Sequence, residues 1–256
     1  MKILIKLGGT LLDAADTRES LTRDITALAR NEEVVVVHGG GKQMTRFLAE
    51  RGVESQFING LRVTTPDVID AVVKVFAGSV NAQLVTAFRV AGAQPVGLSG
   101  LSAGLVDAVQ LDPKLGQVGK PVHSDGRLLN VLVESQYLPV VACVAGDAMG
   151  AIYNVNGDQM AVACAVGFNA QALVFLTDVE GVMDQSKTIF PKLTAAQARQ
   201  LIQDGIATGG MQAKLEAALS ALDQGIGQVL IAPGARPGII RSLAAGELIG
   251  TKMVLQ

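Results

Sequence analysis

The 256-residue chain lacks an excess of either charge, because 21 lysines and arginines face 23 aspartates and glutamates, for a formal net charge of −2 at pH 7. No global positive field is therefore available to attract nucleic acid or an anionic membrane surface. We expect neither as a partner. An anionic substrate would instead need a few cations placed locally at its binding site.

Cysteines and long apolar runs are also scarce. The two cysteines, Cys143 and Cys164, lie inside apolar stretches, which predicts buried thiols in a reducing compartment. The apolar part of the opening MKILIKLGGT is too short for an export signal. No apolar run reaches the roughly 20 residues that a membrane helix needs. We therefore expect a cytoplasmic protein without a membrane segment.

The sequence does contain a repeating alternation of strand and helix patterns. Apolar, β-branched-rich runs that end in glycine or small polar residues occupy 3–7, 34–37, 95–98, 138–144, 173–176 and 229–232. Helical patterns cover 18–30, 42–51, 66–91, 127–136, 158–166, 195–203, 211–224 and 238–245. Strands that are apolar on both faces are typical of parallel sheets. The alternation predicts an α/β fold, a three-layer α/β/α sandwich around a central, mainly parallel sheet.

Two segments interrupt this alternation. Residues 56–64 carry Asn59-Gly60 between short β-prone pieces, which predicts a hairpin. Residues 105–124 alternate weakly, and we interpret them as a β-hairpin or loop insertion. Both lie in the first half, so we expect this half to build a lid over a substrate. A boundary near 169–173 divides the chain into halves 1–170 and 171–256 that share one sheet.

Glycine runs follow two of the predicted strands, at Gly8-Gly9 and at Gly39-Gly40-Gly41. Neither run matches GxxxxGK[ST] or GxGxxG, so those two nucleotide-binding motifs are absent. Glycine still lets backbone N–H groups approach an anion, and a helix that begins after the glycines adds a favourable dipole. The pair of runs indicates an anion site, and tight strand–helix turns are the alternative interpretation.

Several charged residues stand at the predicted ends of strands and helices. Lys6 lies within a buried-type strand directly before the glycines, where a lysine is rare unless it is paired or functional. Lys214 lies early in a helix, where a cation opposes the helix dipole. Arg62 follows the hairpin turn and could bind a carboxylate bidentately. Asp158 precedes an apolar helix and could be its N-cap, although the asparagines before it suggest a polar cluster.

Taken in order, these segments carry a set of motifs that resembles the amino acid kinase family over the whole chain. The motifs are KLGG at 6–9, VHGGG at 37–41, NGLRVT at 59–64, YLPVV at 137–141, NVNGDQ at 154–159, LTDVEGV at 176–182 and GGMQAK at 209–214. The likeness is greatest to members that use ATP, carrying Mg²⁺, to phosphorylate the γ-carboxylate of N-acetyl-L-glutamate in the second step of arginine biosynthesis. One departure is SGLSAG at 99–104, where many relatives have a Lys-Asp pair after Ser-Gly.

The resemblance implies a role for each residue. Lys6 and Lys214 would stabilise the transferring phosphoryl group, and Asp158 would hold both lysines. The remaining assignments are Gly9, Gly40 and Gly41 at the phosphoryl group or substrate, and Arg62 and Asn154 at N-acetylglutamate. The ATP site would comprise Asp178, Val179, Glu180, Gly181, Val182, Met183, Ile206, Ala207 and Thr208. The first half would thus bind the amino-acid substrate and dimerise, and the second half would bind ATP.

Such a reaction needs charge neutralisation and positioning more than a general base, because the attacking carboxylate is already ionised at neutral pH. We accordingly interpret His38 as a strand-end residue and His123 as a loop residue, and we expect no protein-bound metal. Two alternatives are a carrier-linked aminoadipate kinase and a non-catalytic nucleotide-binding regulator. Arg62 favours the free amino-acid substrate, and the presence of Lys6, Asp158 and Lys214 favours catalysis.

The resemblance also leads to an expectation about assembly. Arginine-sensitive members join dimers into rings through an extra N-terminal helix, whereas this sequence opens directly on a predicted strand. We therefore expect a homodimer, paired through the apolar helix at 68–77 and its continuation, that L-arginine does not inhibit.

Overall fold

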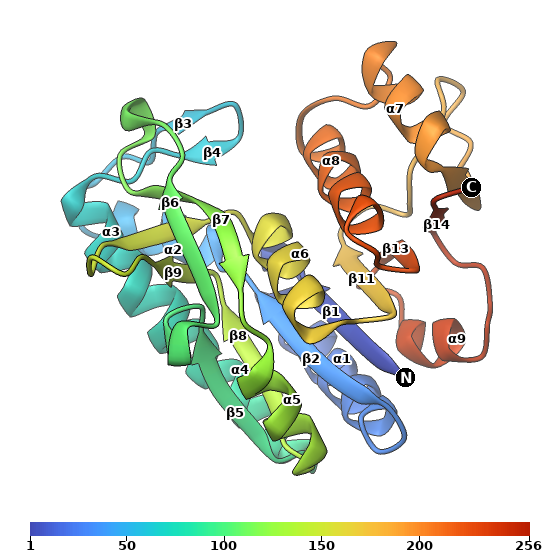
Figure 1. Ribbon diagram of the computed structural model, residues 1–256, viewed down its shortest axis with the longest axis horizontal. Coiled ribbons are helices and arrows are strands. Elements are labelled where there is room, and N and C mark those ends of the chain that lie inside the picture. Colours follow the sequence, from blue (N-terminus) through green and yellow to red (C-terminus); the bar gives the residue numbers. More distant parts are fainter.

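The computed structural model describes residues 1–256. Its main sheet has eight strands in the order β12 (Lys192–Thr194), β14 (Thr251–Val254), β13 (Gln228–Pro233), β11 (Ala172–Thr177), β1 (Lys2–Leu7), β2 (Glu33–His38), β8 (Leu138–Ala142) and β5 (Pro95–Ser99). Every neighbouring pair is parallel except β13 with β14. The predicted mainly parallel sheet is confirmed, and it runs without a break through both halves of the chain (Figure 1).

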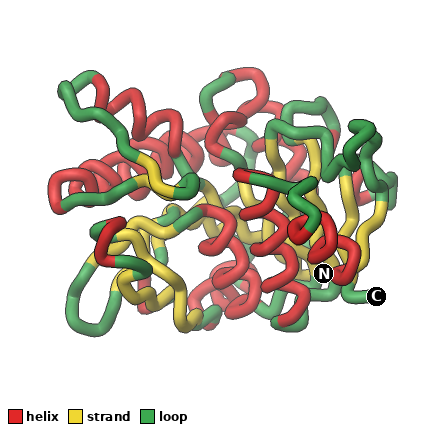
Figure 2. Tube along the Cα trace, turned by 90° about the horizontal axis from the view of Figure 1, so that it is seen from above, coloured by secondary structure: helices red, strands yellow, loops and turns green.

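Helices cover both faces of this sheet. One layer contains α1 (Ala15–Leu28), α4 (Asn81–Val90) and α9 (Ile239–Ala244), and the other contains α5 (Arg127–Glu134), α6 (Gly157–Phe168) and α8 (Gly209–Asp223), with α7 (Ala195–Gln203) packed on α8. Figure 1 shows α6 in front of the sheet and α1 behind it. The tube in Figure 2 shows the strands between layers of helices. The three-layer α/β/α sandwich is therefore confirmed.

Smaller elements gather beyond the carboxyl ends of the strands in the first half. The predicted hairpin forms from β3 (Phe57–Ile58) and β4 (Leu61–Arg62), between α2 (Gly41–Ala49) and α3 (Pro66–Val72). The predicted insertion is the antiparallel pair β6 (Val106–Gln110) and β7 (Val118–Ser124). It closes into a small barrel with β9 (Val144–Gly146) and β10 (Ile152–Val155).

Several predictions of detail are wrong. The apolar run at 138–144 does not form one strand, because β8 ends at Ala142 and the chain continues into the barrel as β9. His123 lies in strand β7, not in a loop. The predicted helix at 66–91 is α3 followed by a π-helix at Val73–Val80 and then α4.

This long helical stretch bears on two further expectations. By length and composition alone, the helical residues Pro66–Val90 could cross a membrane, although the sequence predicted no membrane segment. Half of the most apolar 18-residue window in this stretch is buried inside the protein. Its apolar residues Val68, Val72, Val75 and Phe76 are buried within the chain itself. These four side chains are not available to a second copy, but Val73 and Ala77 are half-buried and Val90, on the continuation of the helix, is 83% exposed. The pairing surface and dimerisation therefore stay predictions.

Candidate functional site

The centre of the candidate site is a buried carboxylate between two lysines. Lys6, near the end of β1, places its Nζ 2.7 Å from Oδ1 of Asp158, and Lys214, from the second turn of α8, places its Nζ 3.1 Å from Oδ2. The three side chains are only 8–18% exposed. Residues far apart in the sequence thus form one ionic cluster, in which Asp158 holds both lysines as predicted from the resemblance.

The charge of this cluster is unbalanced. Burial opposes ionisation of Asp158, but the charges of Lys6 and Lys214 and their hydrogen bonds hold the pKa of this carboxyl below its usual value. One negative group therefore faces two ammonium groups, and the buried cluster carries a net positive charge. A charge without a partner is costly in such a place unless an anion neutralises it. The arrangement suits a ligand that brings negative charge, such as a phosphoryl group.

Glycines make room around the cluster. A β-carbon at Gly157, the first residue of α6, would lie 3.1 Å from Cε of Lys6, so a side chain there would displace the lysine. The two glycine loops also meet, since a β-carbon at Gly9 would lie 3.2 Å from the backbone nitrogen of Gly41. The structure therefore brings the predicted residues Gly9, Gly40 and Gly41 together at the carboxyl ends of β1 and β2.

A cavity of about 310 Å³ opens over the lysines. Its walls come from both halves of the chain, and its lining residues are Lys6, Asn59, Gly60, Leu61, Asn156, Gly157, Asp158, Gly209, Gly210, Ala213 and Lys214. The tip of the β3–β4 hairpin forms one wall and the start of α8 forms the other. The hairpin thus forms part of the site, and its role as a lid stays a prediction. The first turn of α8 presents its N-terminus to the same space.

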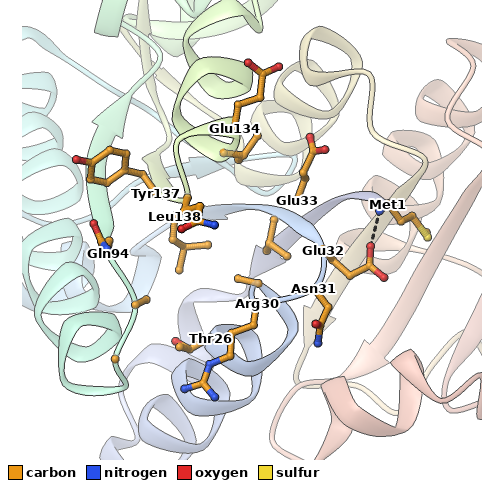
Figure 3. Close-up of a pocket in the computed structure, with 16 residues that line it drawn as sticks. Met1, Thr26, Arg30, Asn31, Glu32, Glu33, Gln94, Glu134, Tyr137 and Leu138 are labelled. Atoms are coloured by element: carbon orange, nitrogen blue, oxygen red, sulfur yellow. Dashed lines mark hydrogen bonds and ion pairs between the residues drawn. The ribbon is translucent and has the colours of Figure 1, made fainter.

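A larger cavity, of about 530 Å³, lies at the opposite edge of the sheet, by the amino ends of β1, β2, β5 and β8 (Figure 3). Glu32, Glu33 and Glu134 line it, and Glu32 pairs with the amino group of Met1. Carboxylates repel a phosphoryl group, although Arg30 also lines this cavity. The smaller cavity contains the two lysines on one buried carboxylate and is therefore the candidate active site despite its size.

Arg62 is buried without any acidic partner. Its guanidinium donates to the hydroxyl of Ser55, to Thr45 Oγ1 at 2.8 Å and to the backbone oxygen of Gly41 at 3.1 Å, and it lies over the ring of Phe57. Burial lowers its pKa. Arg62 therefore lies beside the second glycine loop, although it does not line the cavity over the lysines, and its predicted contact with the substrate carboxylate stays a prediction.

The two asparagines before α6 have different positions. Asn154 donates to Thr64 Oγ1 at 3.0 Å, which ties β10 to the chain just after the hairpin, and it does not line the cavity. Asn156 does line it, and its side-chain oxygen accepts from the backbone N–H groups of Asp158 and Gln159. The interpretation of Asp158 as a possible N-cap is therefore wrong: Asn156 is the cap, and this leaves the Asp158 carboxylate free for the lysines.

The residues predicted for ATP lie in two loops of the second half. Asp178, Val179, Glu180, Gly181, Val182 and Met183 follow β11, and Ile206, Ala207 and Thr208 lead into α8. Val182 and Ala207 are buried in the core, and the backbone N–H of Val182 donates to Thr251 Oγ1 at 2.8 Å. Neither of these two residues therefore offers an exposed side chain to a nucleotide. None of the nine lines the cavity over the lysines.

Sequence reasoning left several lining residues out of the predicted site. They are Asn59, Gly60, Leu61, Asn156, Gly157, Gly209, Gly210 and Ala213. All of them fall within the motifs that carried the resemblance, and the Gly209-Gly210 pair begins helix α8. The signal was present, but only the fold shows that a hairpin turn and a helix start face the same cavity.

The two cysteines and His38 are buried and do not line the cavity. Burial raises the pKa of the Cys143 thiol to about 12 and also raises that of Cys164, so neither supplies a thiolate near neutral pH. Both thiols are free, as expected. His38 is fully buried, and burial lowers its pKa to about 4. It is neutral at physiological pH and faces no part of the cavity lining.

Comparison with known proteins identifies the family. The amino acid kinase family matches residues 1–233. The chain is 64% identical over 255 residues to the acetylglutamate kinase of Solibacter usitatus (strain Ellin6076), with 99% of each chain covered. It is 40% identical over 264 residues to the acetylglutamate kinase of Rhodopseudomonas palustris (strain TIE-1), which covers 97% of this chain and 89% of that one.

Solved structures give the same fold. A protein of Streptococcus mutans UA159 superimposes with a TM-score of 0.84 at 29% identity, with 99% of this chain and 98% of that chain covered. The N-acetylglutamate synthase of Neisseria gonorrhoeae, complexed with coenzyme A and N-acetyl-glutamate, superimposes with a TM-score of 0.87. At 24% identity, and with 59% of that chain covered, this second likeness shows the fold alone. With the whole-chain fold, the lysine–aspartate cluster and these similarities together, the chain belongs to the amino acid kinase family.

Proposed function

We propose that the protein transfers the γ-phosphoryl group of ATP to the side-chain carboxylate of N-acetyl-L-glutamate, forming N-acetyl-L-glutamyl 5-phosphate and ADP. The observation that carries the proposal is the pair of lysines on one buried aspartate, beneath a cavity lined by glycines. The substrate follows from the 64% identity to an acetylglutamate kinase along the whole chain. It fits a site that neutralises charge and contains no general base.

The chemistry divides among a few groups. The carboxylate of the substrate is ionised at neutral pH, so its oxygen attacks the γ-phosphorus while the bond to the bridging oxygen of ADP breaks, and no proton is transferred. Lys6 and Lys214 neutralise the negative charge on the oxygens of the transferring group. Asp158 keeps the two ammonium groups in place between turnovers. The N–H groups of the glycine loops donate to the same oxygens.

The substrates would approach this centre from opposite sides. The first half would hold N-acetylglutamate, with Arg62 and Asn154 as the polar groups nearest the second glycine loop. The second half would hold ATP on the loops after β11 and before α8. No group of three or more His, Cys, Asp or Glu side chains is arranged to hold a metal ion. Mg²⁺ would enter on the phosphates of ATP, since it commonly binds through substrate oxygens.

The wider setting is part of the same proposal. The reaction would form part of arginine biosynthesis in the cytoplasm, and the enzyme would be a homodimer. Neither competing interpretation has comparable support. A non-catalytic regulator would not need the paired lysines, and the curated relatives named above are acetylglutamate kinases, not kinases of a carrier-linked substrate.

Hydroxylamine trapping tests the proposal directly, because it converts an acyl phosphate to a coloured hydroxamate. The purified protein with ATP and Mg²⁺ should give hydroxamate with N-acetyl-L-glutamate and far less with glutamate, aspartate or N-acetyl-aminoadipate. A coupled assay for ADP should report the same preference. Hydroxamate from another acid, with none from N-acetylglutamate, would overturn the assignment.

A further inference from the structure

His38, the last residue of β2, lies directly beneath the second glycine loop but outside the cavity. It is fully buried, and both ring nitrogens have partners. Nδ1 lies 2.8 Å from the backbone oxygen of Gly39, and Nε2 lies 2.9 Å from the side-chain nitrogen of Asn81. Asn81, at the start of α4, is itself 5% exposed. A buried polar chain therefore runs from the helix layer to the loop.

The direction of these hydrogen bonds can be worked out. The nitrogen of the Asn81 amide also lies 2.9 Å from the backbone oxygen of Val140, which can only accept, so this atom is the NH₂ group. The same NH₂ faces Nε2 of His38, which must then be the acceptor. The ring proton of the neutral imidazole is left on Nδ1, where it donates to the Gly39 oxygen. Asn81 thus selects the tautomer that His38 needs to hold the loop.

Holding the Gly39 oxygen also orients the next N–H group. In a planar trans peptide the C=O of Gly39 and the N–H of Gly40 point in opposite directions. An oxygen drawn inwards to His38 therefore turns the Gly40 N–H outwards. Neither Gly40 nor Gly41 donates its N–H to any acceptor within the protein. Because glycines flank this peptide, it could otherwise flip, and the flip would present a carbonyl oxygen to an anion.

The π-helix at Val73–Val80 brings the supporting residues to one face. A β-carbon on Gly40 would lie 2.9 Å from the ring of Phe76 and 3.3 Å from Val80, so both side chains pack under the loop. Asn81 follows directly. Residues five apart, such as Phe76 and Asn81, are turned about 140° from each other on a regular α-helix. The wider turn of a π-helix, with its i→i+5 bonds, brings them closer to one face.

We propose that His38 and Asn81, aligned by the π-helix, are positioning residues that lock the Gly39–Gly40 peptide with its N–H towards the transferring phosphoryl group. This role deepens the proposed function and rests on it. Phosphoryl transfer depends on groups that are already in place when the substrates arrive, and a loop of three glycines cannot hold its own conformation. The buried hydrogen-bonded chain from Asn81 through His38 to the Gly39 oxygen, here called the relay, supplies the rigidity that the glycines lack.

Two substitutions of His38 separate the ends of the relay. Asparagine places its amide nitrogen near the position of Nδ1, so His38→Asn keeps the bond to Gly39 and loses the bond from Asn81. Glutamine places its polar end near Nε2, so His38→Gln keeps Asn81 and loses Gly39. We expect both variants to lose similar thermal stability. His38→Gln should lose roughly tenfold or more in kcat, since small misplacements of binding groups are costly, and His38→Asn should recover most of that loss.

Backbone amide NMR of the free protein supplies a readout that does not depend on the substrate. The Gly40 and Gly41 signals should move in His38→Gln, stay near their wild-type positions in His38→Asn, and be unaffected in His123→Gln, which alters the other, exposed histidine. Equal kcat losses in the two folded variants would overturn the proposal. A wild-type His38 ring protonated on Nε2 would also overturn it, and this measurement does not depend on how well the variants fold. A wild-type protein that ignores N-acetylglutamate would instead overturn the proposed function, and the amide shifts would still decide whether the relay exists.

Discussion

Strand β1 carries a lysine near each end, and the two have different surroundings. Lys2 and Lys6 point to the same face of the sheet, since they are four residues apart on one strand. Lys2 donates to Asn130 Oδ1 at 2.7 Å, lies 4.0 Å from Glu33 and has 29% of its side chain exposed. Lys6 pairs with Asp158 at 2.7 Å and is 10% exposed, and Lys214 pairs with the same carboxylate.

Helix α6 explains the contrast, because it lies across β1 with one end at each lysine. Phe168, its last residue, has its ring 5.1 Å from Nζ of Lys2, where the helix dipole favours a cation. Its first turn brings Asp158 to Lys6, where the dipole disfavours a cation and the carboxylate offsets it. The same residue type is thus a stable surface group at the amino edge of the sheet and a reactive group at the carboxyl edge.

Removing the Asp158 carboxylate should have the largest effect on the surroundings of Lys6. Asp158→Asn leaves two buried ammonium groups without a counter-charge, and removing one partner of a buried ion pair costs about 3–5 kcal/mol. We expect the free energy of unfolding in urea to fall by that order and turnover to be lost. Phosphate or ATP in the unfolding buffer should restore part of the stability. Full activity in a folded Asp158→Asn protein would contradict the role of Asp158.

The carboxyl edge should also respond to acid, through His38 at the end of β2. Its pKa is lowered from 6.5 to about 4 by burial, so the unfolded chain binds a proton that the native state refuses. This contribution to stability is therefore complete above pH 6.5 and declines as the pH falls towards 4, by about 3 kcal/mol in total. Urea unfolding at several pH values measures the slope. His38→Asn should lack it and His123→Gln should keep it; an unchanged slope in His38→Asn would refute this origin.

Lys6→Ala tests the reactive lysine itself. The phosphoryl group would lose one of two neutralising charges, and we expect kcat to fall roughly 10²-fold, about 2.7 kcal/mol in the barrier. Lys214→Ala should behave alike. Steady-state kinetics with saturating ATP and N-acetylglutamate measures the effect, and circular dichroism checks the fold. A normal kcat in either folded variant would show that the lysines are structural.

Arg62→Ala should affect binding more than chemistry. The guanidinium would hold the substrate carboxylate in both the ground state and the transition state, so KM for N-acetylglutamate should rise about tenfold or more while kcat and KM for ATP change little. Arg62→Lys should lie between, since it keeps the charge without the fork. A rise in KM for ATP with no change in KM for N-acetylglutamate would show that Arg62 binds ATP and not the amino-acid substrate.

Lys2→Ala completes the comparison with the smallest effect. Its acidic partner, Glu33, is 4.0 Å away, and exposed pairs contribute about 0–1 kcal/mol. We expect kcat to be unchanged and the free energy of unfolding to fall by less than about 1 kcal/mol. A large loss of activity here would mean that the two edges are not functionally distinct.

Much of the architecture could be predicted, because buried strands and the helices between them leave clear apolar patterns. The patterns at 34–37 and 195–203 correspond closely to β2 and α7. Strands β10, β12 and β14 were missed, since they are three or four residues long and β10 contains Asn154, which reads as a loop residue. The π-helix was missed because its register changes within an apolar stretch whose burial pattern remains helical.

The sequence by itself determined the layered α/β fold, the glycine loops at strand ends and, through ordered motifs, the lysine–aspartate cluster of the site. These depend on local preferences and on the spacing of apolar residues, which the linear chain contains. Only the tertiary structure decided that Asn156 caps α6, that the hairpin tip faces α8, and that Asn81 sets the tautomer of His38. Each of these depends on contacts between elements far apart in the chain. The distances and directions of these contacts are set by how the helices pack on the sheet.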